Sequence, residues 1–211
     1  METGIAPRLL LLSVIAVSVV EATAVCLVSM TGVPYLTAIG LARLFDGILI
    51  IVLLQVLGHG LSDIGLSPSS LMAGVKRGLA WSGFFFGLAL MGMGILLALG
   101  REPPPIIGMT LPPTRGGLLL AFVVAGFIGP VAEEMFFRGI IFGYFRAWGF
   151  ATALAASSLL FAAAHLLTVP LPLVQLFGGV LLAVIYEYER NLMVPIVVHV
   201  AGNIVIIMIS L

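Results

Sequence analysis

The stretch from Gly117 to Phe145 reads GLLLAFVVAGFIGPVAEEMFFRGIIFGYF, an apolar run with two adjacent acids and one base inside it. About 20 mostly apolar residues are enough for a transmembrane helix, so this run predicts a long or tilted span. A charge at mid-bilayer costs about 2.5–3.5 kcal/mol on insertion scales. Ionisable residues in such a span therefore usually face the protein interior and usually have a function.

The composition extends this prediction to the whole chain. Of the 211 residues, 62% are hydrophobic and 9% are charged, whereas soluble domains carry about 25% charged residues. A core of this size could not hide so much apolar surface from water, so we expect one integral membrane domain over residues 1–211. The net charge is zero and basic runs are absent, which argues against a nucleic-acid partner. The single cysteine, Cys26, excludes an internal disulfide and a cysteine-based metal site.

Seven apolar segments predict an all-α fold, a polytopic transmembrane helical bundle of about seven spans. The segments are Leu9–Met30, Leu36–Leu57, Gly78–Leu99, Gly117–Phe145, Ala151–Leu167, Leu171–Tyr186 and Leu192–Leu211. The fifth and sixth are short, so six or eight spans are also possible. In the third, Gly83 and Gly87 are four residues apart, a spacing that permits close helix contact. No pattern indicates the oligomeric state.

The basic residues between the segments predict the orientation. With seven spans, one side carries Arg8, Lys76, Arg77, Arg146 and Arg190, and the other carries Arg101 and Arg115. Because basic loop residues favour the cytoplasmic side, we expect a cytoplasmic N-terminus. The first apolar run continues well beyond a sequence that resembles a signal cleavage site, so we expect it to be a retained helix.

Glu133 and Glu134 differ in their local surroundings. Neighbours on a helix point about 100° apart, so the two carboxylates face different directions. Glu134 precedes Arg138 by four residues, the favoured order for an ion pair, and is predicted to be neutralised by it. Glu133 has no partner nearby in the sequence and could act as a general base or acid. Alternatively, these residues form helix-packing ion pairs, or Glu133 faces a water-lined surface.

Two further spans carry histidines. Phe161 and His165 share one helical face, and His199 and Asn203 share another, because the members of each pair are four residues apart. In hydrocarbon each polar group needs a polar partner. Taken singly, His165 also fits an interfacial residue, and the pair on the last span fits a helix–helix hydrogen bond.

The first two spans carry Glu21, Arg43 and Asp46. Arg43 and Asp46 are three residues apart and can neutralise each other, so we interpret them as structural. Glu21 has no evident partner. His59 lies in a loop and has no predicted role.

The depth of the polar residues connects the separate motifs. Glu133 and His165 each lie 16 residues from Gly149, where the fourth and fifth segments are joined. In an antiparallel hairpin the two residues would reach the same depth. His199 and Asn203 enter the bilayer from the same side. Three helices are therefore predicted to direct a carboxylate, two imidazoles and an amide at one buried, water-accessible volume.

Three short motifs also resemble a known family. They read Glu133-Glu134-Met-Phe-Phe-Arg138, Phe161-Ala-Ala-Ala-His165 and His199-Val-Ala-Gly-Asn203. In this order they resemble the signature of the CPBP family of membrane proteins, which includes CAAX proteases and bacteriocin-processing enzymes and is also called the Abi family. The resemblance covers residues 117–205, which we expect to form the catalytic core.

The resemblance implies an intramembrane glutamic endopeptidase related to the type II CAAX prenyl proteases, in a prokaryotic cytoplasmic membrane. Its substrate would be a membrane-associated protein or peptide, cleaved in CAAX-type, C-terminal sorting-tail or leader processing. Glu133 would activate water, His165 would hold that water, and His199 and Asn203 would stabilise the oxyanion. Glu134, Arg138 and Phe161 would give structural support.

The resemblance implies no cofactor, and zinc is the alternative. Two histidines and a glutamate match a common catalytic zinc shell, although a His-Glu-x-x-His helix motif is absent. Two other functions remain open. One is a non-catalytic bacteriocin-immunity or scaffold protein of the same fold. The other is a small transporter, because buried Glu and His also form proton relays, but the sequence has no internal repeat.

Overall fold

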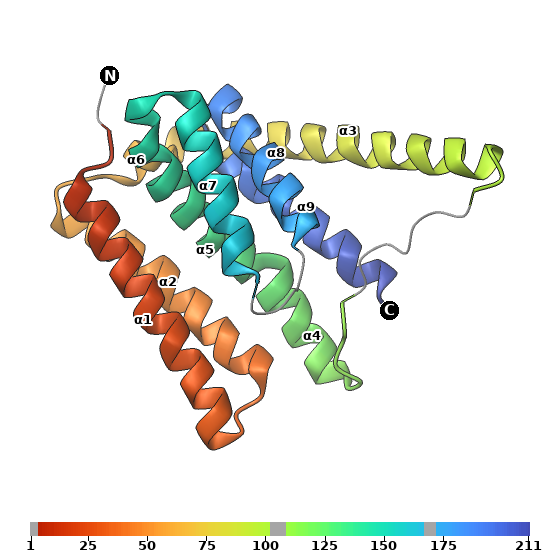
Figure 1. Ribbon diagram of the computed structural model, residues 1–211, viewed down its shortest axis with the longest axis horizontal. Coiled ribbons are helices and arrows are strands. Elements are labelled where there is room, and N and C mark those ends of the chain that lie inside the picture. The colour runs from red at the N-terminus through yellow and green to blue at the C-terminus, as the bar shows by residue number, and fades with distance from the viewer. Residues whose placement is uncertain (1–3, 102–108, 167–171) are drawn as a thin grey trace.

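The computed structural model describes residues 4–101, 109–166 and 172–211, and within these ranges the chain is helical with no strand (Figure 1). The helices are α1 Pro7–Thr31, α2 Tyr35–Val56, η1 Leu61–Ile64, η2 Pro68–Ser70, α3 Leu71–Ala98, α4 Arg115–Val123, η3 Val124–Ile128, α5 Gly129–Glu134, η4 Met135–Phe142, α6 Gly143–Phe145, η5 Arg146–Trp148, α7 Phe150–Ala164, α8 Leu173–Glu189 and α9 Met193–Ile209. The elements α4 to η5 form one continuous helix, which corresponds to the fourth predicted segment. With these elements counted as one, the longer helices follow the seven predicted segments. Leu167 and Leu171, predicted as segment ends, lie outside the described residues.

Four of these helices are long and apolar enough to cross a bilayer. They are Pro7–Thr31, Tyr35–Val56, Pro68–Ala98 and Arg115–Trp148. Helices α7, α8 and α9 are shorter, with 15, 17 and 17 residues. The predicted class, an all-helical membrane bundle, is confirmed, and the chain is an integral membrane protein. The third segment begins ten residues before the predicted Gly78 because the 3₁₀ turn at Pro68 leads directly into α3.

Helices α1 and α2 form a hairpin that lies against one side of the bundle (Figure 1). Its inner face is built from small residues, Ala24, Ala38 and Ala42, which let the two helices approach closely. Gly40 of α2 faces the next layer, where an added Cβ would lie 2.6 Å from a methyl of Val124. The absence of a side chain at Gly40 therefore brings α2 up to the helix that carries the paired glutamates.

The continuous helix from Arg115 to Trp148 is not uniformly α-helical. Two π-helical segments, η3 and η4, flank the six residues of α5. Pro130, near the start of α5, cannot donate the backbone hydrogen bond that an α-helix requires, and the helix is widened over the residues directly before it. The apolar pattern predicted the helix but contained no signal for these widened turns.

The hairpin of this helix with α7 turns at Gly149, whose φ of 101° favours glycine. Phe137 and Phe161 each lie 12 residues from Gly149, and their rings meet edge to face with centroids 5.1 Å apart. The Ser157 hydroxyl donates to the Phe137 carbonyl at 3.0 Å. Residues at equal distances from the turn thus lie at equal depth, as the sequence predicts.

Helix α3 crosses α9 and then extends away from the bundle (Figure 1). The crossing depends on glycine, because a Cβ on Gly78 would lie 2.5 Å from the Cβ of Val197. Gly83 and Gly87, where the sequence permits close contact, have no neighbouring described atom within 4 Å of an added Cβ. The close approach therefore lies at an earlier turn of α3 than the Gly83–Gly87 spacing indicates.

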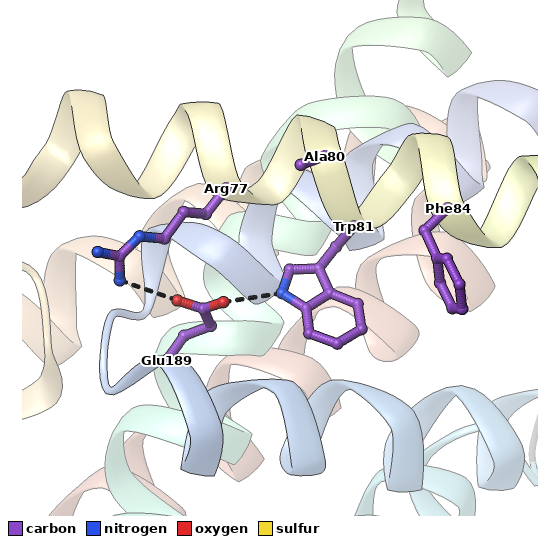
Figure 2. Close-up of a pocket in the computed structure, with 5 residues that line it drawn as sticks. All are labelled: Arg77, Ala80, Trp81, Phe84 and Glu189. Atoms are coloured by element: carbon purple, nitrogen blue, oxygen red, sulfur yellow. Dashed lines mark hydrogen bonds and ion pairs between the residues drawn. The ribbon is translucent and has the colours of Figure 1, made fainter.

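One carboxylate joins the start of α3 to the end of α8 (Figure 2). Glu189 accepts hydrogen bonds from Arg77 Nη1 at 3.0 Å and from Trp81 Nε1 at 2.8 Å. Together with Ala80 and Phe84 these residues line a groove of about 380 Å³. The contact places Arg77 close to the end of α8, in agreement with the predicted grouping of Arg77 and Arg190 on one side.

Candidate active site

Glu134 is fully buried and joins α5 to α9. Its Oε1 accepts a hydrogen bond from Arg138 Nη1 at 2.7 Å, so the predicted ion pair is present. The same oxygen lies 2.8 Å from His199 Nδ1. A carboxylate oxygen accepts hydrogen bonds, so Nδ1 is the donor in this contact. Glu134 therefore fixes the orientation of the imidazole in addition to stabilising its own helix.

Arg138 has no exposed surface and contacts two further structural elements. Its Nη2 donates to the carbonyl of Gly179 on α8 at 3.1 Å. Its guanidinium carbon lies 4.7 Å from the centroid of the Phe161 ring on α7, a cation–π contact. Gly179 permits this arrangement, because an added Cβ there would lie 3.3 Å from Phe161. Arg138 thus holds the motif-bearing helices together.

Glu133 lies on the other side of the same imidazole. Its Oε2 is 3.8 Å from His199 Nε2, too far for a direct hydrogen bond, and its side chain is 12% exposed. Glu133 and Glu134 point in different directions, as expected of neighbours on a helix. Both nevertheless reach His199, one at each ring nitrogen.

Glu133 also has a charged partner that the sequence did not indicate. Its Oε1 lies 3.5 Å from Arg43 Nη2 on α2, so the prediction that Glu133 lacks an ion-pair partner holds only for its sequence neighbours. Arg43 Nη1 lies 3.4 Å from Asp46 Oδ2, as predicted, and 2.9 Å from Glu21 Oε1. The predicted Arg43–Asp46 pair is therefore present, and Glu21, which has no evident partner in the sequence, pairs with the same arginine. His59 pairs with Asp63 in the loop after α2.

His165 and Phe161 share a face at the end of α7, as their spacing predicts. Their ring centroids are 4.8 Å apart, and His165 Nδ1 lies 2.9 Å from the Phe161 carbonyl oxygen. The Phe161 ring also meets His199 edge-on, with centroids 5.9 Å apart. Both imidazoles therefore pack against one phenyl ring. Glu133 contacts His199 and Arg43. His165 packs against the Phe161 ring, which in turn packs against His199.

Asn203 lies one turn after His199 on α9 and is directed at the helix that carries Glu133. Its Nδ2 donates to the carbonyl of Ala125 at 2.7 Å. Ala125 lies in the π-helical segment η3. The predicted helix–helix hydrogen bond is therefore present. A side-chain amide carries two N–H groups, so this bond occupies one donor of Asn203.

Across the described ranges, no group of three or more histidine, cysteine, aspartate or glutamate side chains has the arrangement of a metal site. The acids and His199 instead contact one another and two arginines.

A helical bundle with acids, arginines and histidines gathered inside it defines a polytopic membrane protein with a polar site among its helices. Residues 115–205 match the family model described as type II CAAX prenyl endopeptidase Rce1-like. This segment carries all three motifs and matches the family that the resemblance predicted. Searches of curated proteins and of solved structures found no match to the chain.

Proposed function

We propose that this protein is an intramembrane glutamic endopeptidase that hydrolyses a peptide bond in a membrane-associated protein or peptide. The observation that carries the proposal is the position of His199 between two acids, with Glu134 at Nδ1 and Glu133 at Nε2, inside the Rce1-like segment. Glu134 is buried, and its Oε1 is held by Arg138 and His199, whereas Glu133 keeps some exposure. Glu133 is therefore the acid that can reach water and substrate.

The chemistry requires an activated water and stabilisation of a tetrahedral oxyanion. Glu133 takes a proton from water, and the water oxygen forms a bond to the peptide carbonyl carbon. As the C–N bond breaks, Glu133 returns that proton to the leaving nitrogen. His165 orients the water.

His199 and Asn203 would stabilise the oxyanion. Because Glu134 holds Nδ1, the atom that His199 can offer to a substrate is Nε2. Donation from Nε2 requires a ring that carries both protons. Asn203 would contribute the N–H that does not bond Ala125. Loss of one such donor typically costs about 100–1,000-fold in rate.

The proposed substrates are CAAX-type C-termini, C-terminal sorting tails and leader peptides. The first class is the one named in the description of the matching family. We propose that no metal takes part. Treatment of the purified protein with a chelator checks this point, because loss of cleavage and its recovery with zinc would identify a metallopeptidase.

The decisive experiment compares protein termini in membranes of cells that lack this protein and are restored with either wild type or Glu133→Gln. We expect a small set of new termini with wild type only. The substitution is nearly isosteric and removes the base. The control is that wild type and Glu133→Gln are expressed at the same level. Identical termini in the two samples would contradict the proposal. They would favour a non-catalytic scaffold, for which the contacts of His199 and Arg138 serve only to join helices.

A further inference from the structure

Arg43 lies outside the segment that carries the family motifs. It belongs to α2, whereas the matched segment begins at residue 115. It is nevertheless one of only two arginines in the described residues that form an ion pair with Glu133 or Glu134; the other is Arg138. The α1–α2 hairpin thus contributes a cation to the candidate active site.

The two ends of the Arg43 guanidinium have different partners. Nη1 forms ion pairs with Glu21 of α1 and Asp46 of its own helix, at 2.9 and 3.4 Å. Nη2 lies 3.5 Å from Glu133. The planar fork of arginine allows this division, because it presents several donors in fixed directions. A cation needed only to neutralise the α1–α2 hairpin would not require the second contact.

The charge balance argues against a free anion-binding role for Arg43. Three carboxylates surround one guanidinium, which is 20% exposed. A further anion, such as a substrate carboxylate, would meet net negative charge at this position. The surroundings of Arg43 favour a role that acts through the carboxylates already present.

We propose that Arg43 is a positioning residue for Glu133. It pairs with the Glu133 carboxylate and holds Oε1, so that Oε2 faces His199 Nε2. The catalytic part of this inference rests on the proposed function, but the ion pair with Glu133 does not. The α1–α2 hairpin therefore completes the site that the three motifs begin.

The test measures the protonation of Glu133 without measuring cleavage. An apolar carbodiimide adds to a protonated carboxyl group in a membrane and does not add to a carboxylate. The protein is purified in lipid nanodiscs, treated with dicyclohexylcarbodiimide, and the adduct is located by tandem mass spectrometry. Glu133→Gln identifies the signal that belongs to this residue. We expect little labelling of Glu133 in wild type and at least about tenfold more in Arg43→Gln, because an opposite charge at this distance favours the charged form.

Three variants complete the design. Arg43→Lys keeps the cation and should retain low labelling. Arg77→Gln removes an arginine that is also ion-paired, to Glu189, and should leave Glu133 unchanged. The double variant Arg43→Gln/Asp46→Asn removes one acid together with the base, so it provides a folded sample if the single variant does not assemble, and it should be labelled like Arg43→Gln. Unchanged labelling of Glu133 in both Arg43→Gln forms would overturn the proposal.

Cleavage is measured separately, as the number of wild-type-dependent termini in cells. If the proposed function holds, Arg43→Gln lowers their formation by about 10–100-fold, part of the 100–10,000-fold that a positioned base contributes, and Arg43→Lys recovers most of it. If no termini depend on wild type while the labelling responds to Arg43, the peptidase assignment fails and the positioning contact stands.

Discussion

Arg138 shows how a full charge is kept inside a membrane bundle. The side chain is fully buried, and its desolvation is offset by Glu134, the Gly179 carbonyl and the Phe161 ring. Such a pair contributes little net free energy, but removal of one partner leaves the other charge unpaired. The contacts are therefore costly to break singly.

We predict that Arg138→Met lowers the free energy of unfolding by about 3–5 kcal/mol, because Glu134 is left buried without its cation. Thermal unfolding in detergent, followed by circular dichroism, measures the change. Arg77→Met is the matched control, since Arg77 is 58% exposed and its ion pair is worth about 1 kcal/mol or less. Equal losses in the two variants would contradict the role given to Arg138.

Asn203 provides a second prediction at this scale. Asn203→Leu is expected to cost about 1–3 kcal/mol, because the Ala125 carbonyl then loses its donor. Asn203→Gln is the control, since it keeps the amide on a longer side chain. The loss is measured as a shift in thermal unfolding. A stable Asn203→Leu protein that has lost cleavage would assign Asn203 to chemistry alone.

The sequence predicted the residue contacts that lie within one helix and missed the contact that α2 makes with Glu133. The Glu134–Arg138 and Phe161–His165 pairs follow from four-residue spacing. The Arg43–Glu133 contact joins α2 to α5, and no local pattern encodes it. A signal was nevertheless present, because Glu21 and Glu133 are acids in apolar segments without partners nearby in the sequence, and Arg43 is a base in another such segment.

At the scale of elements, two glycines of α3 have different surroundings: one lies at a helix interface and the other lies on open surface. Gly78 faces α9 directly, whereas Gly83 has open space around it among the described residues. Both lie on the same helix and are five residues apart, so they form a matched pair for substitution.

We predict opposite effects of alanine at these two positions. Gly78→Ala should destabilise the protein by about 1–3 kcal/mol through overpacking against Val197. Gly83→Ala should be neutral or stabilising by up to about 1 kcal/mol, because alanine favours the helix. Unfolding of both variants in the same detergent gives the comparison. A loss at Gly83 as large as that at Gly78 would show that the Gly83 surface is also an interface.

The element boundary at Gly149 was predicted well, whereas the start of the third segment was predicted ten residues too late, after Lys76 and Arg77. The Gly149 turn and the α7 hairpin are as expected. The π-helical segments were not predictable, because their composition is as apolar as that of the flanking α-helix. The hydrogen-bond register of such a helix depends on its neighbours, among them the Asn203 amide at Ala125.

At the scale of the whole molecule, ion pairs join the ends of several helices. Arg146 of η5 and Arg190 after α8 both bond Glu187, and Arg77 bonds Glu189. These basic residues gather at one end of the bundle, and on the positive-inside rule we propose that this end faces the cytoplasm.

Thiol labelling tests this orientation. In a Cys26→Ser background, Ser69→Cys and Thr110→Cys place single exposed thiols before and after α3. We expect a membrane-impermeant maleimide, applied to intact cells, to label Thr110→Cys and to reach Ser69→Cys only after permeabilisation. The reverse result would invert the orientation, and labelling of both from outside would show that α3 does not cross the bilayer.

The two widened turns around α5 have a consequence for how this site can change during evolution. A π turn is equivalent to an α-helix that has accepted one extra residue. Deletion of one residue from η3 would restore ordinary winding there and leave the turns on either side close to their present directions. Single-codon deletions at this turn would therefore be absorbed locally, and the paired glutamates would keep their directions toward α2 and α9.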